Sequence, residues 1–269
     1  MANLNRYLDE LSLIKVLLFF ILVILVMTLF GMVFNIEYGD LTFKLILYGF
    51  MIVFFAYNFN HVKTKGGETF STSLNDALQS MFSKNSFFSI LFIIVSNILF
   101  VAFIFFLLEY MGRTGILNFD SYLFGNLGAL NMATLIVYFV SVVIFSPIVE
   151  EVLFRGIFLR RFNEEFGNVT LAILVSSVLF ALCHSFGGIS GAFLFGICMA
   201  VLYIKSENIL VPIFAHFMNN LISFVLGLSG IEFLLYDNAI SIAIVMILAV
   251  AFNAYLFKSI IAEWPKRMN

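Results

Sequence analysis

Long apolar segments, interrupted by few charged residues, are the feature of this 269-residue sequence that most restricts its fold. A helix needs about 20 apolar residues to cross a bilayer, and every backbone polar group within the lipid must be paired. The sequence predicts eight such spans, near residues 13–34, 41–58, 87–108, 137–162, 169–185, 189–204, 209–228 and 238–257. The predicted fold is therefore all-α, a polytopic transmembrane helix bundle.

The overall composition agrees with a membrane location. Hydrophobic residues make up 62% of the chain and charged residues 11%, whereas soluble domains contain about 45–50% apolar and about 25% charged residues. A nucleic-acid-binding protein would need a basic surface, and a membrane β-barrel would need short strands of alternating polarity. The two cysteines, Cys183 and Cys198, offer no disulfide framework. We therefore expect an integral, multi-pass membrane protein that contacts the lipid bilayer and binds no nucleic acid.

Basic residues near the span ends predict the orientation of the bundle, because cytoplasmic loops carry an excess of Lys and Arg. If the N-terminus is cytoplasmic, the outer side holds two basic residues, Lys44 and Arg113, and Arg155 lies inside a span. The inner side then holds eleven: Arg6, Lys15, Lys63, Lys65, Lys84, Arg160, Arg161, Lys205, Lys258, Lys266 and Arg267. Both termini are therefore expected in the cytoplasm. Enrichment in Phe, Ile, Asn and Lys is typical of an AT-rich bacterial genome, which points to a bacterial cell membrane.

The chain is expected to form a single membrane domain over residues 1–269. The residues that could carry chemistry lie within 130–228, which is the predicted core of the site. Residues 1–129 and 229–269 would supply additional spans and tails. Between the second and third spans, residues 59–86 are rich in Ser, Thr, Asn and Lys, and they are predicted to be a solvated connecting loop.

Two adjacent glutamates, Glu150 and Glu151, lie inside the fourth predicted span. A carboxylate at the centre of a bilayer costs about 2.5–3.5 kcal/mol on insertion scales, so such residues usually have a function. Arg155 is four residues after Glu151 and shares its helical face, whereas Glu150 is rotated by about 100°. We expect a structural ion pair between Glu151 and Arg155, and a free carboxylate at Glu150 that could act as a general base. Two alternatives remain open: the span could end at Val149, or all three charges could form a buried network without chemistry.

Two of the three histidines, His184 and His216, also lie in predicted spans. A lone histidine in a helix bundle is more often packed than catalytic, but these two accompany an acidic pair. With a rise of about 1.5 Å per residue, antiparallel helices would bring Glu150 and His184 to similar depths, about 24 and 27 Å from the inner turn. His216 and Asn220 would lie about 12 and 18 Å from the inner loop at 205–208, and tilted or kinked helices could bring them to the same site. His216 and Asn220 are four residues apart on one face, as are Phe180 and His184. We therefore expect these polar residues to face one cavity.

Prolines precede two of these residues: Pro147 is three residues before Glu150, and Pro212 is four residues before His216. A proline inside a helix frees a backbone carbonyl and bends the axis. In a membrane such a break is tolerated where protein or a water-filled cavity satisfies the freed group. Ordinary kinks that improve packing explain either proline alone equally well.

Three segments then resemble the motifs of a known family. They are EEVLFR at 150–155, FALCH at 180–184 and HFMNN at 216–220. They are similar to the EExxxR, FxxxH and HxxxN motifs of the CPBP intramembrane proteases, which include the type II CAAX prenyl endopeptidases and the bacterial Abi proteins. The resemblance covers roughly residues 130–228.

The resemblance implies a glutamate protease mechanism. Glu150 would activate a water molecule, and His184 would help to hold it. His216 and Asn220 would stabilise the oxyanion of the tetrahedral intermediate, a task that suits preorganised donors in a low-dielectric site. The remaining motif residues would support this set: Glu151, Arg155 and Phe180.

A zinc site is the alternative use of the same side chains, since Glu150, His184 and His216 make a conceivable ligand set. We favour a mechanism without metal or other cofactor. The HExxH motif is absent from the sequence, and an oxyanion role accounts for His216 together with Asn220.

Other intramembrane protease patterns fit less well. The GISG stretch at 188–191 imitates the GxSG of rhomboids, but it is typical of a glycine-rich turn and no rhomboid-like histidine motif follows. Tyr236–Asp237 resembles the YD of presenilins, but their GxGD motif is absent. A Cys183 nucleophile beside His184 is disfavoured because adjacent helical residues point about 100° apart.

Two classes of function follow from these observations. The first is an intramembrane glutamic endopeptidase that hydrolyses a peptide bond of a membrane-associated protein or peptide on the cytoplasmic side. The second is a non-proteolytic membrane scaffold, regulator or bacteriocin-immunity protein that binds a membrane partner. The sequence predicts no oligomeric state. The intact motifs favour the endopeptidase.

Overall fold

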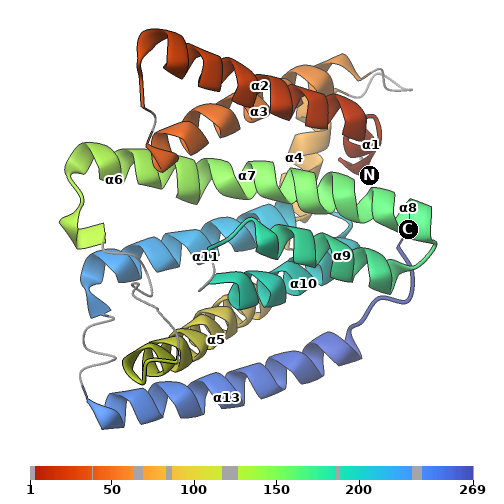
Figure 1. The fold of residues 1–269 in the computed structure, drawn as a ribbon. Coiled ribbons are helices and arrows are strands. Elements are labelled where there is room, and N and C mark those ends of the chain that lie inside the picture. Colours follow the sequence, from red (N-terminus) through yellow and green to blue (C-terminus); the bar gives the residue numbers. More distant parts are fainter. Residues whose placement is uncertain are drawn as a thin grey trace.

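The computed structural model describes residues 4–37, 39–62, 69–82, 87–116, 127–185, 188–231 and 238–268. All regular structure within these ranges is helical, which confirms the predicted fold class (Figure 1). Within the same ranges, seven helices are long and apolar enough to cross a membrane, and an eighth apolar helix is shorter. The chain is therefore a multi-pass integral membrane protein.

Each predicted span corresponds to a helix of the structure. The first part of the chain forms α1 (Asn5–Asp9), α2 (Leu13–Phe34), α3 (Asp40–His61), α4 (Phe70–Ser80), α5 (Phe87–Arg113) and the short η1 (Leu127–Ala129). One long helix follows, made of α6 (Met132–Tyr138), η2 (Phe139–Phe145), α7 (Ser146–Glu151), η3 (Val152–Leu159) and α8 (Arg160–Phe166). The remaining helices are α9 (Val169–Leu182), α10 (Ile189–Ser206), α11 (Leu210–Ser229) and α13 (Ala239–Ala262).

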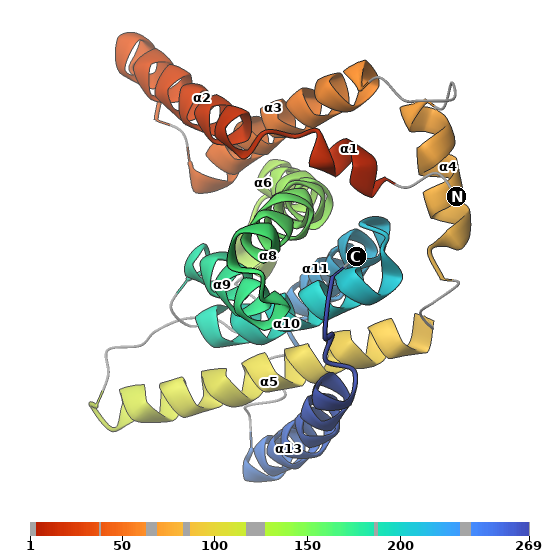
Figure 2. The same cartoon turned by 90° about the vertical axis from the view of Figure 1, so that its right-hand side faces the viewer.

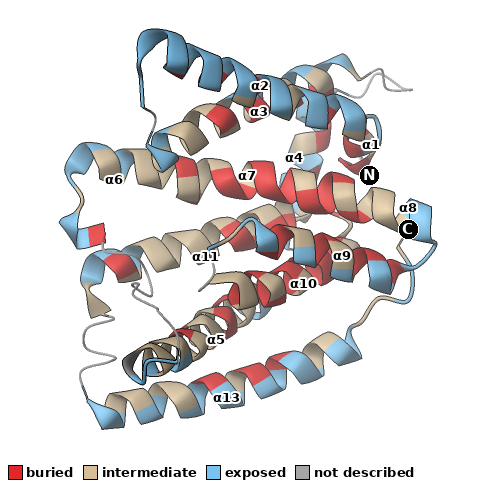
Figure 3. Cartoon of the chain, viewed as in Figure 1, coloured by how far each residue is buried: buried red, intermediate tan, exposed pale blue. Residues whose placement is uncertain are grey.

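The arrangement of the helices places the motif-bearing segments at the centre. Figure 2 shows α6–α8, α9, α10 and α11 as a central group, with α2 and α3 on one side and α5 and α13 on the opposite side. Burial is highest in α10 (Figure 3): 67% of its apolar window is buried, against 17% for α2 and for α13. The outer helices therefore turn most of their apolar side chains toward the lipid, which acts as their solvent.

Helix α9 is the short member of the bundle. Its 14 residues span about 21 Å at 1.5 Å per residue, less than the hydrocarbon thickness of about 30 Å. In Figure 1 the left-hand ends of α9 and α10 stop short of those of α6 and α11. The turn that joins α9 to α10 is therefore set back from the end of the bundle.

The two termini lie on the same side of the bundle (Figure 1). That arrangement fits an even number of crossings, but the cytoplasmic location of this side stays a prediction. Among the basic residues behind it, Lys63, Lys65 and Lys84 lie outside the described residues, as does the side chain of Arg113. Lys44 lies within α3, where its Nζ is 3.4 Å from Oε1 of Glu150.

The polar segment 59–86 is not simply the solvated loop that the sequence predicted. It contains α4, which starts with a capping box between Thr69 and Thr72. Ser73 and Ala77 of α4 are buried, and the Ala77 carbonyl accepts a hydrogen bond from Asn208 Nδ2 at 2.8 Å. A short amphipathic helix was missed because polar residues dominate its exposed face.

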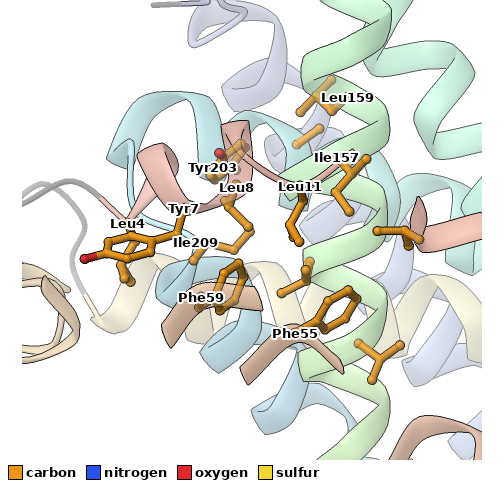
Figure 4. Close-up of a cluster of buried hydrophobic side chains, with 14 of the residues drawn as sticks. Leu4, Tyr7, Leu8, Leu11, Phe55, Phe59, Ile157, Leu159, Tyr203 and Ile209 are labelled. Carbon is orange, nitrogen blue, oxygen red and sulfur yellow. The ribbon is translucent and has the colours of Figure 1, made fainter. Parts of the chain in front are cut away.

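Close to the termini, a cluster of buried hydrophobic side chains joins the N-terminal segment to α3 and η3 (Figure 4). Leu8 and Leu11, from the N-terminal segment, pack with Ile157 of η3 and with Phe55 of α3. Gly156 permits the close approach, since a Cβ at this position would lie 2.9 Å from Leu8 Cδ2. The N-terminal segment thus packs against the end of the bundle at which the termini lie.

Candidate active site

The long helix that carries the two glutamates contains two π-helical segments, η2 and η3, one on each side of α7. Such segments are rare and occur frequently at functional sites. At the end of η2 the Ser146 N–H bonds to the Ser141 carbonyl, five residues earlier. The next bond of this series would join Pro147 to Val142, but proline has no N–H. The Val142 carbonyl instead accepts a hydrogen bond from Asn220 Nδ2 at 2.9 Å.

The second proline has no comparable effect. Pro212 is the third residue of α11, and the Ile213 N–H still bonds to the Ile209 carbonyl at 3.3 Å. N–H groups in the first turn of a helix have no intrahelical partner, so a proline there removes none of its bonds. Of the two prolines, Pro147 is therefore the one that frees a backbone carbonyl, that of Val142.

Glu151 and Arg155 form the predicted ion pair, with 2.9 Å between Oε1 and Nη1. Both side chains are almost completely buried. Arg155 Nη2 also donates to the Gly196 carbonyl of α10 at 3.1 Å, and a Cβ at Gly196 would lie 3.2 Å from the Ser177 Cα of α9. The alternative in which the span ends at Val149 is wrong, because the helix continues to Phe166.

Glu151 has a second partner that the sequence did not predict. The same Oε1 lies 2.8 Å from Nδ1 of His216 on α11. A hydrogen bond to one ring nitrogen fixes the orientation of an imidazole. Glu151 therefore holds Arg155 and His216 together and leaves Nε2 as the ring nitrogen that faces Glu150.

Glu150 is buried as expected but is not a free carboxylate, which corrects the sequence prediction. Its Oε1 accepts a hydrogen bond from the Tyr48 hydroxyl at 2.9 Å and another from the Ser146 hydroxyl. Lys44 Nζ lies 3.4 Å from the same oxygen. Its Oε2 lies 3.9 Å from His216 Nε2, which is too long for a hydrogen bond.

The two α3 residues, Lys44 and Tyr48, are functional candidates that sequence reasoning missed. Helix α3 begins beside the start of α6, and Gly49 faces Phe145 of η2, so the two helices run side by side in the same direction. Lys44 and Tyr48 are four residues apart on one face of an otherwise apolar helix. That spacing was the available signal, but Lys44 was counted as a charge at the outer side.

His184 reaches the site from a turn rather than from a helix. Helix α9 ends at Leu182, and the His184 N–H bonds to the Ala181 carbonyl at 3.0 Å. Its Nδ1 lies 2.9 Å from the Phe180 carbonyl. Glu150 interacts electrostatically with His184 as well as with His216. His216 thus lies directly beside Glu150, with 3.9 Å between Nε2 and Oε2, and His184 lies within electrostatic range of the same carboxylate.

Phe180 is the aromatic centre of the cluster. The Arg155 guanidinium lies over its ring, 4.5 Å from the centroid. The ring centroids of His184 and His216 lie 4.7 Å and 5.8 Å from that of Phe180. Such cation–π and edge contacts fix the positions of all three partners.

Asn220 lies one turn beyond His216 on α11. Its Nδ2 donates to the Val142 carbonyl, and its Oδ1 accepts a hydrogen bond from Asn219 Nδ2 at 3.3 Å. Asn220 is therefore hydrogen-bonded to the helix that carries Glu150. The acceptor is the Val142 carbonyl, to which Pro147 cannot donate.

The centre of the cluster is buried, whereas His184, Asn220 and the α3 edge are partly exposed. Glu150, Glu151, Arg155 and His216 are all buried, whereas the Lys44 side chain is 33% exposed. A hollow of about 460 Å³ lies at the starts of α3 and α6, one turn before Lys44. It is lined by Gly39, Asp40, Leu41, Thr42, Ala133, Thr134 and Val137.

The other sequence candidates differ in their outcome. The GISG stretch forms the start of α10, and the Cys183 thiol donates to the Leu179 carbonyl at 3.4 Å. Tyr236–Asp237 lies outside the described residues. Across the described ranges, no three His, Cys, Asp or Glu side chains are grouped so that they could hold a metal ion.

Comparisons with known proteins support the motif assignment. Residues 132–222 match the family described as type II CAAX prenyl endopeptidase Rce1-like, a stretch that includes all the candidate residues of the three motifs. The chain is 39% identical over 80 residues to the Bacillus subtilis (strain 168) protein named "Putative membrane peptidase YdiL". This alignment covers 29% of the chain and 32% of the relative, so the chain spans about a third of the relative's length. No solved structure matches the chain.

Proposed function

We propose that the chain is an intramembrane glutamic endopeptidase that hydrolyses a peptide bond of a membrane-associated protein or peptide. The match over residues 132–222 and the name of the YdiL relative support peptide hydrolysis. The observation that carries the proposal is the geometry of Glu150: one carboxylate oxygen is held by donors, and the other lies 3.9 Å from His216 Nε2. A buried carboxylate with one uncommitted oxygen beside an imidazole is suited to general-base chemistry.

The first step is the activation of water. Two hydrogen bonds of about 2.8 Å can bridge atoms 3.9 Å apart, so one water molecule fits between Glu150 Oε2 and His216 Nε2. Glu150 takes a proton from this water as its oxygen attacks the carbonyl carbon of the scissile peptide bond. His184, whose ring contacts Phe180 as that of His216 does, helps to hold the water.

The second step is the collapse of the tetrahedral intermediate. Its oxyanion is stabilised by the second N–H of Asn220, since the first is donated to Val142. His216 also donates to the oxyanion from Nε2 when its ring carries both protons, because Nδ1–H bonds to the Glu151 carboxylate. Glu150 then transfers its proton to the leaving nitrogen, the C–N bond breaks, and a carboxylic acid and an amine are released. Glu150 thus acts first as a base and then as an acid.

Glu151 and Arg155 act through their neighbours. Glu151 orients His216, and Arg155 balances the charge of Glu151 while it fixes Phe180. No metal or other cofactor enters the proposed mechanism. The predicted approach of the substrate from the cytoplasm depends on the membrane orientation. The N-terminal segment packs against the end of the bundle that is predicted to be cytoplasmic.

A regulator or scaffold that binds a membrane partner is the competing function. It would use the same fold, but it would not need the carboxylate of Glu150. The requirement for this one side chain therefore distinguishes the two functions.

The experiment compares the full-length wild-type chain with its Glu150→Gln variant in proteoliposomes. The probe is a total membrane-protein extract of Bacillus subtilis, and new peptide termini are identified by mass spectrometry. We expect cleavage by the wild type and none by Glu150→Gln. Glu164→Gln is the matched control, because Glu164 is exposed and pairs only with Arg161 at 2.8 Å, and it should cleave like the wild type. Equal cleavage by wild type and Glu150→Gln would disprove the proposal.

A further inference from the structure

The charges of the buried cluster do not balance within the three motifs. Two buried carboxylates, Glu150 and Glu151, accompany one motif cation, Arg155, which pairs with Glu151. A buried charge without a partner is strongly destabilising. The second cation comes from outside the motifs: it is Lys44 of α3, 3.4 Å from Glu150.

The contacts of Lys44 also select one oxygen of the carboxylate. Lys44 and the Tyr48 hydroxyl both approach Oε1 of Glu150. The Lys44 Nζ lies 5.2 Å from the centroid of the Tyr48 ring, so the two side chains support each other through a cation–π contact. With Oε1 held by α3, Oε2 is the oxygen directed at His216.

The position of Lys44 distinguishes it from the other charged groups near Glu150. Arg155 and His216 are buried and committed to Glu151. Lys44 is one-third exposed, at the edge of the cluster. A cation in this position can remain paired with Glu150 while water and substrate reach the carboxylate.

From this geometry we propose that Lys44 is a positioning residue of the active site, which holds Glu150 with Oε2 facing the attacking water. Tyr48 assists by donating to the same oxygen as Lys44. The inference rests on the proposed peptidase function and extends its site to α3, outside the matched residues 132–222.

The kinetic test uses a fluorophore–quencher peptide made from the sequence that the wild type cuts most in the Bacillus subtilis extract. Lys44→Met should lower kcat by about 10²-fold with KM unchanged, the effect of a displacement of about 1 Å at a reacting group. Lys44→Arg should restore most of kcat, because the charge returns. Lys258→Met on α13 is the control, since Lys258 is exposed, and it should match the wild type.

A double-mutant cycle on the melting temperature in detergent tests the contact without any substrate. Lys44→Met should lower the melting temperature of the wild type but not that of the Glu150→Gln variant, because only an ionised partner makes the pair. Equal shifts in both backgrounds, or a Lys44→Met kcat equal to that of Lys258→Met, would overturn the inference. Cleavage that does not depend on Glu150 would instead overturn the proposed function, and the cycle would still report on the pair.

Discussion

The two sides of α7 surround chemically identical residues in opposite ways. On the side that faces α3, Glu150 meets a hydroxyl and a partly exposed ammonium group. On the side that faces α10 and α11, Glu151 meets Arg155 and His216 in an almost completely buried cluster. A rotation of about 100° between successive residues is enough to separate the two environments. One helix thus presents a partly accessible carboxylate and a completely enclosed one at adjacent positions.

The largest effect on stability is expected from a substitution on the side of α7 that faces α10 and α11. Arg155→Ala leaves the Glu151 carboxylate buried without its cation, so we expect a loss of about 3–5 kcal/mol in the free energy of unfolding. Glu150→Gln, on the other side, should lose less, because it removes only the pair with the partly exposed Lys44 and leaves no buried charge unpaired. Denaturant unfolding in detergent micelles measures both variants.

The matched control for Arg155→Ala is Arg161→Ala. Arg161 pairs with Glu164 at the exposed end of the long helix and donates to the Asp9 carbonyl at 2.9 Å. Surface pairs contribute about 0–1 kcal/mol, and a typical hydrogen bond adds about 1 kcal/mol, so this variant should lose less stability than Arg155→Ala. If Arg155→Ala and Glu150→Gln lost comparable stability, the division between the two glutamates would be wrong.

The next effect concerns His216, which connects the two sides of α7. His216→Ala removes one donor to the oxyanion, so turnover should fall by about 10²–10³-fold.

We expect the active wild type to contain no stoichiometric zinc and to keep its activity in chelators. Elemental analysis of purified, active protein checks this together with the turnover assay.

A zinc site would give a different pattern. One bound zinc per chain, lost along with activity when Glu150, His184 or His216 is replaced, would contradict the metal-free mechanism. Inhibition by chelators alone would not establish a zinc site, because chelators can also affect the assay. A zinc site also requires that activity returns when zinc is added back.

Local patterns in the sequence predicted much of the fold and part of the site. Apolar run length located the helices that correspond to the eight predicted spans, seven of which are long enough to cross a membrane among the described residues. Helical periodicity paired Glu151 with Arg155. Both follow from short-range geometry. The contact between Tyr48 and Glu150 joins residues 102 positions apart, and no local pattern encodes such a distance. The sequence analysis ended this span at residue 185, three residues beyond the end of α9 at Leu182, so His184 was expected within a helix rather than in the turn.

The most direct test of the account is a single-turnover reaction in water enriched in ¹⁸O, followed by mass spectrometry of the product and of the protein. If Glu150 is a base, ¹⁸O enters the new carboxyl group of the product in the first turnover, while Glu150 and Glu151 stay unlabelled. Glu150→Gln should yield no labelled product. The appearance of ¹⁸O in the Glu150 side chain after one turnover would show a covalent acyl intermediate and contradict the proposed activation of water.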